Sequence, residues 1–161
     1  SDSFDVVHYD LMLDMTDYWG QTMQGLATIE FTVLQGGGTT MWWDLESLVV
    51  DSVHWNGEAV TFSQLESQLH VDAPAPMQVG EQVVLEVWYG GEPGSDPYWG
   101  GMYFASDLIY NLGIGLTTIP PNFGRVWYPC FDNFVERATY TYRLRTTDGR
   151  RAHNQGWFCC R

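Results

Sequence analysis

The sequence holds few residues whose type and spacing could support catalysis. Its four histidines are His8, His54, His70 and His153. None of them forms the His-Glu-x-x-His pattern that places two imidazoles on one helix face around zinc. His54 and Glu58 flank the Asn56-Gly57 turn, which would bring them together across a hairpin. One such pair is a weak basis for a metal site, and a surface or hydrogen-bonded imidazole is the expected role of a strand histidine.

Other catalytic patterns are also missing from the sequence. There is no Gly-x-Ser-x-Gly elbow and no glycine loop of the kind that cradles phosphate. The three cysteines, Cys130, Cys159 and Cys160, have neither a disulfide framework nor zinc spacing. Cys130 follows Pro129 in an apolar stretch, so we expect a buried thiol. The chain alone is therefore expected to bind no metal or other cofactor and to be inactive.

Aromatic residues offer the main candidate surface, since the chain has eight tryptophans. Trp42 and Trp43 are adjacent in an expected strand and must point to opposite faces. At least one of them is then exposed or covered by another domain. Together with Trp99 they form a candidate docking or stacking surface. Docking to protein is the preferred interpretation, and a stand-alone, aromatic-rich β-sandwich module that binds glycan or protein is the alternative.

Most of the chain alternates between apolar and polar residues with a period of two, which is typical of half-buried strands. The expected strands cover residues 7–15, 25–33, 41–45, 48–55, 59–62, 69–71, 82–89, 102–104 and 139–145. Between them lie the Asn56-Gly57 hairpin turn and two long Gly/Pro loops, at 90–101 and 111–121. The sequence predicts an all-β fold: a saddle-like β-sandwich of mostly antiparallel strands with long Gly/Pro loops.

Charge is distributed unevenly along the chain. Residues 1–124 contain 17 Asp and Glu but no Lys or Arg, and all seven arginines follow, for a net charge of −13. An acidic surface repels phosphate, so nucleic acid is not an expected partner. No run of about 18 apolar residues is present, so no membrane span is expected.

The most specific segment is Gly124 to Tyr140, which contains Arg125, Trp127, Pro129, Cys130, Phe131, Asp132 and Arg137. It resembles the amino-terminal domain of M1-family, aminopeptidase N-like zinc metallopeptidases, in which an Arg, an aromatic and Pro-Cys-Phe-Asp precede a basic residue and an Ala-Thr strand. Phe4–Met15, Gly25–Phe31 and Val87–Gly91 are similar to further family segments in the same order.

The resemblance implies a non-catalytic domain that packs on a zinc catalytic domain of the same polypeptide and walls its peptide-binding cleft. Buried Arg125 and Asp132 would anchor the motif loop by pairing, and Arg137 would be a solvated or pairing residue and not a substrate clamp. In the family a Gln or Glu contacts the substrate amine, and its position falls at Pro120, which has no side-chain acceptor, so that contact is not expected here. Residues 1–152 would form the domain, incomplete at its end, and 153–161 an atypical tail. An open sheet edge would then permit self-association. The resemblance slightly favours an extracytoplasmic or secreted location.

Overall fold

The computed structural model describes residues 3–119, 121–132, 137–147 and 149–153. The described part of the chain is built from strands, with one short 3-10 turn and no α-helix, so the all-β prediction is confirmed. Among these residues no helix has the length and apolarity needed to cross a membrane.

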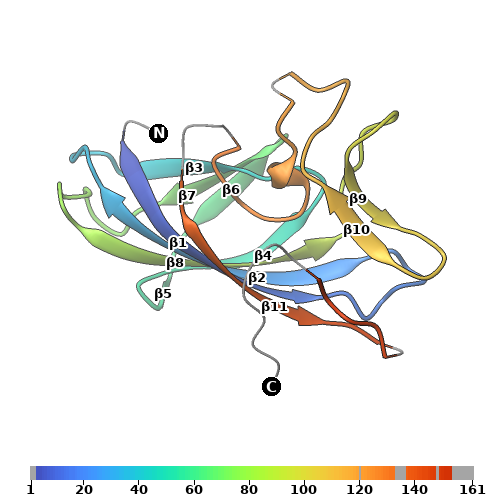
Figure 1. Cartoon of the computed structure of the whole chain (residues 1–161). Coiled ribbons are helices and arrows are strands. Elements are labelled where there is room, and N and C mark those ends of the chain that lie inside the picture. The colour runs from blue at the N-terminus through green and yellow to red at the C-terminus, as the bar shows by residue number, and fades with distance from the viewer. Residues whose placement is uncertain (1–2, 120, 133–136, 148, 154–161) are drawn as a thin grey trace.

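A six-stranded sheet forms the larger layer, in the order β11-β1-β2-β8-β4-β5. Its strands are β1 (Phe4–Asp14), β2 (Met23–Val33), β4 (Val49–Trp55), β5 (Glu58–Ala59), β8 (Gln82–Gly91) and β11 (Thr139–Arg145). Neighbours are antiparallel except for the first and last strands of the chain, since β1 and β11 run parallel. In Figure 1 this twisted sheet runs across the lower part of the molecule.

Two smaller sheets complete the fold. The three-stranded sheet has the order β3-β7-β6, and a hairpin joins β9 to β10. These strands are β3 (Thr40–Asp44), β6 (Phe62–Leu65), β7 (Gln68–Asp72), β9 (Gly101–Phe104) and β10 (Ile109–Leu112). Figure 1 shows β3, β6 and β7 above one end of the large sheet and the β9–β10 hairpin at the other end.

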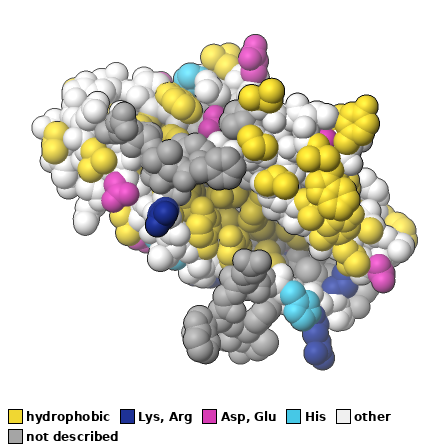
Figure 2. Space-filling model, turned by 45° about the horizontal axis from the view of Figure 1, so that its top comes forward, with side chains coloured by type: hydrophobic (Ala, Val, Ile, Leu, Met, Phe, Trp, Pro, Cys, Tyr) yellow, Lys and Arg dark blue, Asp and Glu magenta, His cyan; other side chains and the backbone are white. Residues whose placement is uncertain are grey.

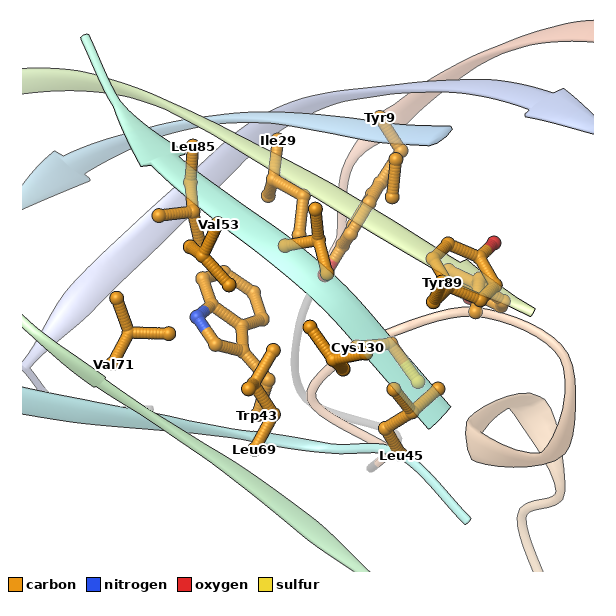
Figure 3. Packing of buried hydrophobic residues seen from close by; sticks show 14 of the residues in the cluster. Tyr9, Ile29, Trp43, Leu45, Val53, Leu69, Val71, Leu85, Tyr89 and Cys130 are labelled. Carbon is orange, nitrogen blue, oxygen red and sulfur yellow. The ribbon is translucent and has the colours of Figure 1, made fainter. Parts of the chain in front are cut away.

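The hydrophobic core lies between the large sheet and the β3-β7-β6 sheet. Trp43 is at its centre, with 0% of its surface exposed. Its ring stacks on Phe131 at 4.3 Å between centroids and meets Phe31 edge to face at 5.8 Å. Figure 3 shows Trp43 among Leu69, Val71 and Val53, side chains that come from both layers. This two-layer burial is what the period-two alternation predicts.

The first strand departs from the predicted alternation at one point. Leu11 and Leu13 are buried as expected, but Val7 is 49% exposed, and Phe4 and Val6 are buried instead. The pairing of β1 with β2 shifts register between Val6 and His8. A bulge adds one residue and so reverses which face the earlier side chains occupy.

The predicted strand at residues 59–62 is wrong. Asn56 and Gly57 do form the expected turn, with φ of 50° and 87°. The return strand β5 ends at Ala59, however, and the chain then crosses to the other layer, where β6 begins at Phe62 and pairs with β7. The crossing is held by the Thr61 hydroxyl, which donates to Asp72 at 2.8 Å.

Candidate functional site

The polar contacts of the motif segment converge on one guanidinium group, that of Arg125. A 3-10 turn, η1 (Gly124–Val126), places Arg125 so that its Nη1 lies 2.7 Å from Asp132 Oδ2 and its Nε lies 2.8 Å from Glu46 Oε2. Nη1 also donates to the Asn122 carbonyl at 2.6 Å. The side chains of Arg125 and Asp132 are 15% and 8% exposed. We call this set of contacts the Arg125 junction; it ties the motif segment to the loop after β3.

Backbone bonds extend the Arg125 junction to the end of β3. Asp44 and Cys130 exchange two main-chain hydrogen bonds, of 2.8 and 3.1 Å, and the Asp132 N–H donates to Asp44 Oδ2 at 3.0 Å. Burial raises the pKa of Asp44, and the charge of Asp132 adds to this, while hydrogen bonding and Arg125 oppose it. Burial, with the charges of Asp132 and Asp44, raises the pKa of the Cys130 thiol well above its usual value. Cys130 is thus a protonated, buried thiol and has no nucleophilic character.

The other motif residues have packing positions. Phe131 lies between Trp43 and Phe4, with centroid distances of 4.3 and 5.3 Å. Pro129 is buried, Trp127 is half-buried and Arg137 is exposed. In the structure, Glu46, Asp44 and Asn122 are the partners of the segment.

Beside the motif, aromatic rings form a continuous stack. The centroid distances are 5.0 Å from Tyr9 to Tyr140, 5.8 Å from Tyr140 to Tyr142, and 6.2 Å from Tyr142 to Trp127. Burial raises the pKa of Tyr142 to about 12, so its hydroxyl stays neutral at physiological pH. The end of this stack lines a groove of about 920 Å³ with Leu13, Met15, Met102, Ile109 and Leu144. Figure 2 shows hydrophobic side chains gathered in a hollow on one face of the molecule.

A second apolar surface is formed by two loops that precede the motif. Five large side chains are exposed there, and we call them the apolar loop cluster: Tyr98 (78%), Trp99 (52%), Ile114 (50%), Leu116 (68%) and Ile119 (99%). The Leu116 N–H donates to the Trp99 carbonyl at 3.1 Å, which joins the two loops.

Asp96 fixes the conformation of these loops. Its carboxylate is 3% exposed and accepts the N–H groups of Tyr98, Trp99 and Thr117 at 2.9, 2.9 and 2.8 Å, together with the Thr117 hydroxyl. Burial alone would raise the pKa of Asp96, but these hydrogen bonds outweigh it and hold the pKa well below the usual range. The apolar loop cluster is therefore presented on a preorganised backbone. Asp96 was missed in the sequence, because nothing distinguishes it among so many acidic residues.

The predicted tryptophan surface is corrected in part. Trp42 and Trp99 are 46% and 52% exposed, so they remain available for contacts, but Trp43 is a core residue and cannot belong to a docking surface. Side chains along β3 alternate between exposed and buried, as expected for a strand, and this alternation places Trp43 inside and Trp42 outside. Pro120 and residues 154–161 of the tail lie outside the described residues.

The histidines are not brought together. Across the β4–β5 hairpin His54 pairs with Ala59, while Glu58 pairs with Trp55, so the predicted facing of His54 and Glu58 is wrong. The His54 ring packs on Trp88 at 4.7 Å between centroids. His8 Nδ1 lies 2.7 Å from the Thr139 hydroxyl. Among the described residues, no group of three or more His, Cys, Asp or Glu side chains could hold a metal.

Comparison with solved structures identifies the fold. No family model and no curated protein matches the sequence. An M1 zinc metallopeptidase from Deinococcus radiodurans, however, superposes with a TM-score of 0.77 at 27% identity, over 91% of this chain and 33% of that chain. The matched part is its amino-terminal third. This is the fold of an M1 amino-terminal domain.

Two further structures give the same result for the M1-type domain. A mutant of the Deinococcus radiodurans enzyme bound to a Tyr-Ser-Ala substrate has a TM-score of 0.77 and 27% identity, covering 89% of this chain and 33% of that one. A two-domain M1 zinc metallopeptidase mutant bound to L-tryptophan has a TM-score of 0.78 and 26% identity, covering 91% and 33%. The chain thus spans about a third of the length of the metallopeptidases that it matches.

Proposed function

We propose that this chain is the non-catalytic amino-terminal domain of an M1-type zinc metallopeptidase, which packs on a zinc catalytic domain of the same polypeptide and forms one wall of its peptide cleft. The observation that carries the proposal is the match over 91% of this chain with only 33% of a metallopeptidase. The zinc ligands belong to the catalytic domain in this proposal. The described residues do not fit a zinc site, and the sequence has no His-Glu-x-x-His.

The apolar loop cluster supports the docking role. Five large apolar side chains on joined loops are more than scattered surface exposure, and contiguous apolar patches mark interaction sites. Asp96 holds the loop backbone before any partner binds, which lowers the entropy cost of association. The second loop leads through Asn122 into the Arg125 junction, and Gly94 at the start of the first loop donates its N–H to the Val126 carbonyl at 3.4 Å, so the core of the domain fixes the position of both.

The first test is zinc content and hydrolysis of aminoacyl and peptide substrates by the purified chain. We expect neither stoichiometric zinc nor turnover. The reading frame that encodes the chain should also encode a His-Glu-x-x-His, about a hundred or more residues downstream. Stoichiometric zinc with turnover by the chain alone, or an intact reading frame without that motif, would overturn the proposal.

The docking surface is tested by mixing the purified chain with the separately produced catalytic domain from that reading frame. Replacing Trp99 and Leu116 by alanine should weaken binding at least about tenfold, because aromatic and large apolar residues dominate interface energies. Trp19, which is 88% exposed but is not part of the apolar loop cluster, provides the matched control. Trp19→Ala should leave binding unchanged. Equal effects of both changes would refute the assignment of the surface.

A further inference from the structure

The strand β11 presents a free edge within the part of the chain that the structure describes. β11 is the outermost strand of the large sheet, and β1 is its only neighbour there. Its seven residues make it the longest of the edge strands: β3 has five, β6, β9 and β10 have four each, and β5 has two. β11 carries no Pro or Lys, two residues that usually protect an edge from pairing, and its two arginines are paired with carboxylates of β1.

The hydrogen-bond pattern identifies which groups face outward. The Met15 N–H donates to the Arg145 carbonyl at 2.9 Å, so Arg145 faces β1. In a parallel ladder alternate residues face the same neighbour, so Thr141 and Arg143 face β1 as well. The N–H and C=O groups of Tyr140, Tyr142 and Leu144 therefore point away from the sheet.

These outward groups are self-complementary. If a second β11 is placed antiparallel with Tyr142 opposite its own copy, Tyr140 stands opposite Leu144 of the copy and Leu144 opposite Tyr140. Each of the three pairs can exchange both backbone hydrogen bonds, because outward residues then face outward residues. Side chains of directly opposite residues share a face, so the pairs are aromatic with aromatic and aromatic with leucine. The aromatic pair is of a kind that stabilises antiparallel sheets, and the two tyrosine–leucine pairs bring apolar surfaces together.

Charge also favours this edge for contact between copies. The chain has a net charge of −13, so acidic surfaces of two copies repel each other. On β11, Arg143 and Arg145 are neutralised by Asp10 and Asp14 of β1, at 2.7 and 3.0 Å. Every arginine in the sequence lies at or after residue 125. The β11 edge is thus in the region of the molecule where the repulsion is weakest.

From these observations we propose that the chain forms a two-fold symmetric dimer in which β11 of each copy pairs antiparallel around Tyr142. The two large sheets then join into one continuous sheet of twice the width. This contact does not depend on the proposed docking to a zinc domain, because it uses backbone groups of β11 and not the apolar loop cluster.

The test is sedimentation velocity of the 161-residue chain from low micromolar to submillimolar concentration. We expect a monomer–dimer equilibrium that shifts toward dimer as salt rises from about 0.02 M to about 0.5 M, since salt screens the repulsion between acidic copies. Leu144→Pro removes one outward N–H per copy and leaves the bonds to β1 intact. It should weaken the dimer about tenfold to a hundredfold, because the symmetry removes the bond twice.

Leu144→Ala is the matched control, since it loses the same side chain but keeps the outward N–H. Equal dimer dissociation constants for the Pro and Ala variants would refute the pairing, as would a monomer at every concentration. Hydrogen exchange of the unmodified chain gives a second measurement that does not depend on whether the Pro variant folds. The amides of Tyr140 and Tyr142 should become protected only as the dimer fills, while those of Thr141 and Arg143 stay protected throughout. Unprotected Tyr140 and Tyr142 amides in a dimer would place the contact elsewhere.

Discussion

Replacing the mostly buried Arg125 by methionine should destabilise the domain far more than replacing an exposed arginine such as Arg143. The substitution keeps the aliphatic stem but removes the bonds to Asp132, Glu46 and the Asn122 carbonyl. Asp132 would retain only long backbone donors, the N–H groups of Gly124 at 3.2 Å and of residue 125 at 3.4 Å. Its carboxylate would then stay buried without a counter-charge.

The size of the effect follows from the burial of each partner. Breaking a buried pair by removing one member costs about 3 to 5 kcal/mol of unfolding free energy. Arg125 is 15% exposed, so we take the lower end, about 3 kcal/mol, for the Asp132 contact. The Glu46 carboxylate is 39% exposed, and its contact should add no more than about 1 kcal/mol. A loss of about 3 to 4 kcal/mol is a large part of the about 5 to 15 kcal/mol that stabilises a typical domain.

Urea unfolding followed by tryptophan fluorescence measures this loss. With a denaturant slope of about 2 kcal/mol per molar, the midpoint should fall by about 1.5 to 2 M. Arg143→Met is the matched control, because Arg143 pairs with Asp10 but is 58% exposed, so its loss should cost less than about 1 kcal/mol. Adding Asp132→Asn to the Arg125 variant should reveal a coupling of about 2 kcal/mol.

The reasoning fails if Arg125→Met and Arg143→Met have the same unfolding free energy within about 0.5 kcal/mol, the usual range for surface changes. It also fails if the Arg125 and Asp132 substitutions are additive. In either case the Arg125 junction would be a surface contact in energetic terms, and the packing of Phe131 on Trp43 would have to hold the motif segment alone.

Three further predictions concern single side chains. Because the pKa of Asp96 is lowered in the folded state, its contribution to stability is present at neutral pH and is lost as the pH falls below the ordinary carboxyl range. Asp96→Asn should therefore flatten the acid side of a plot of thermal midpoint against pH. An unchanged acid slope would contradict this. Gly25→Ala should lower the free energy of unfolding by about 1 to 3 kcal/mol, because the added Cβ would overlap the buried Tyr89 ring. Gly113→Ala is the control: the space around that position is open, so its free energy of unfolding should change by no more than about 0.5 kcal/mol. Equal urea midpoints for the two variants would refute the overlap. In a variant with serine in place of Cys159 and Cys160, Cys130 should react with a thiol reagent only as fast as the chain unfolds. Fast labelling of the native chain would contradict the burial and the raised pKa of Cys130.

Local sequence patterns were sufficient for most of the fold. Leu11 and Leu13 alternate with polar neighbours and enter the core, and Asn56-Gly57 turns the chain where expected, because both effects depend on neighbouring residues alone. The pairing of Arg125 with Asp132 follows the same kind of local reasoning, since two charged residues in an aromatic segment require pairing when buried.

Contacts between distant segments could not be predicted in the same way. Glu46 meets Arg125 across 79 residues, and no periodicity relates the two positions. The parallel pairing of β1 with β11 is likewise set by how the loops route the chain, and the sequence pattern of a strand is compatible with either direction. The register shift between Val6 and His8 could not be predicted for the same reason, because a bulge depends on how two strands pair and not on the pattern of one.

The parallel pairing of β1 and β11 has a consequence for synthesis on the ribosome. His8 and Thr139, which lie side by side in the finished sheet, are 131 residues apart in the chain. β1 leaves the ribosome first, pairs with β2, and then keeps its other edge open until β11 (Thr139–Arg145) has been translated. Contacts of such long sequence separation are the slowest to form, so closure of β11 onto β1 should be the last step of folding. Until β11 arrives, the outer edge of β1 is therefore expected to be open to chaperones.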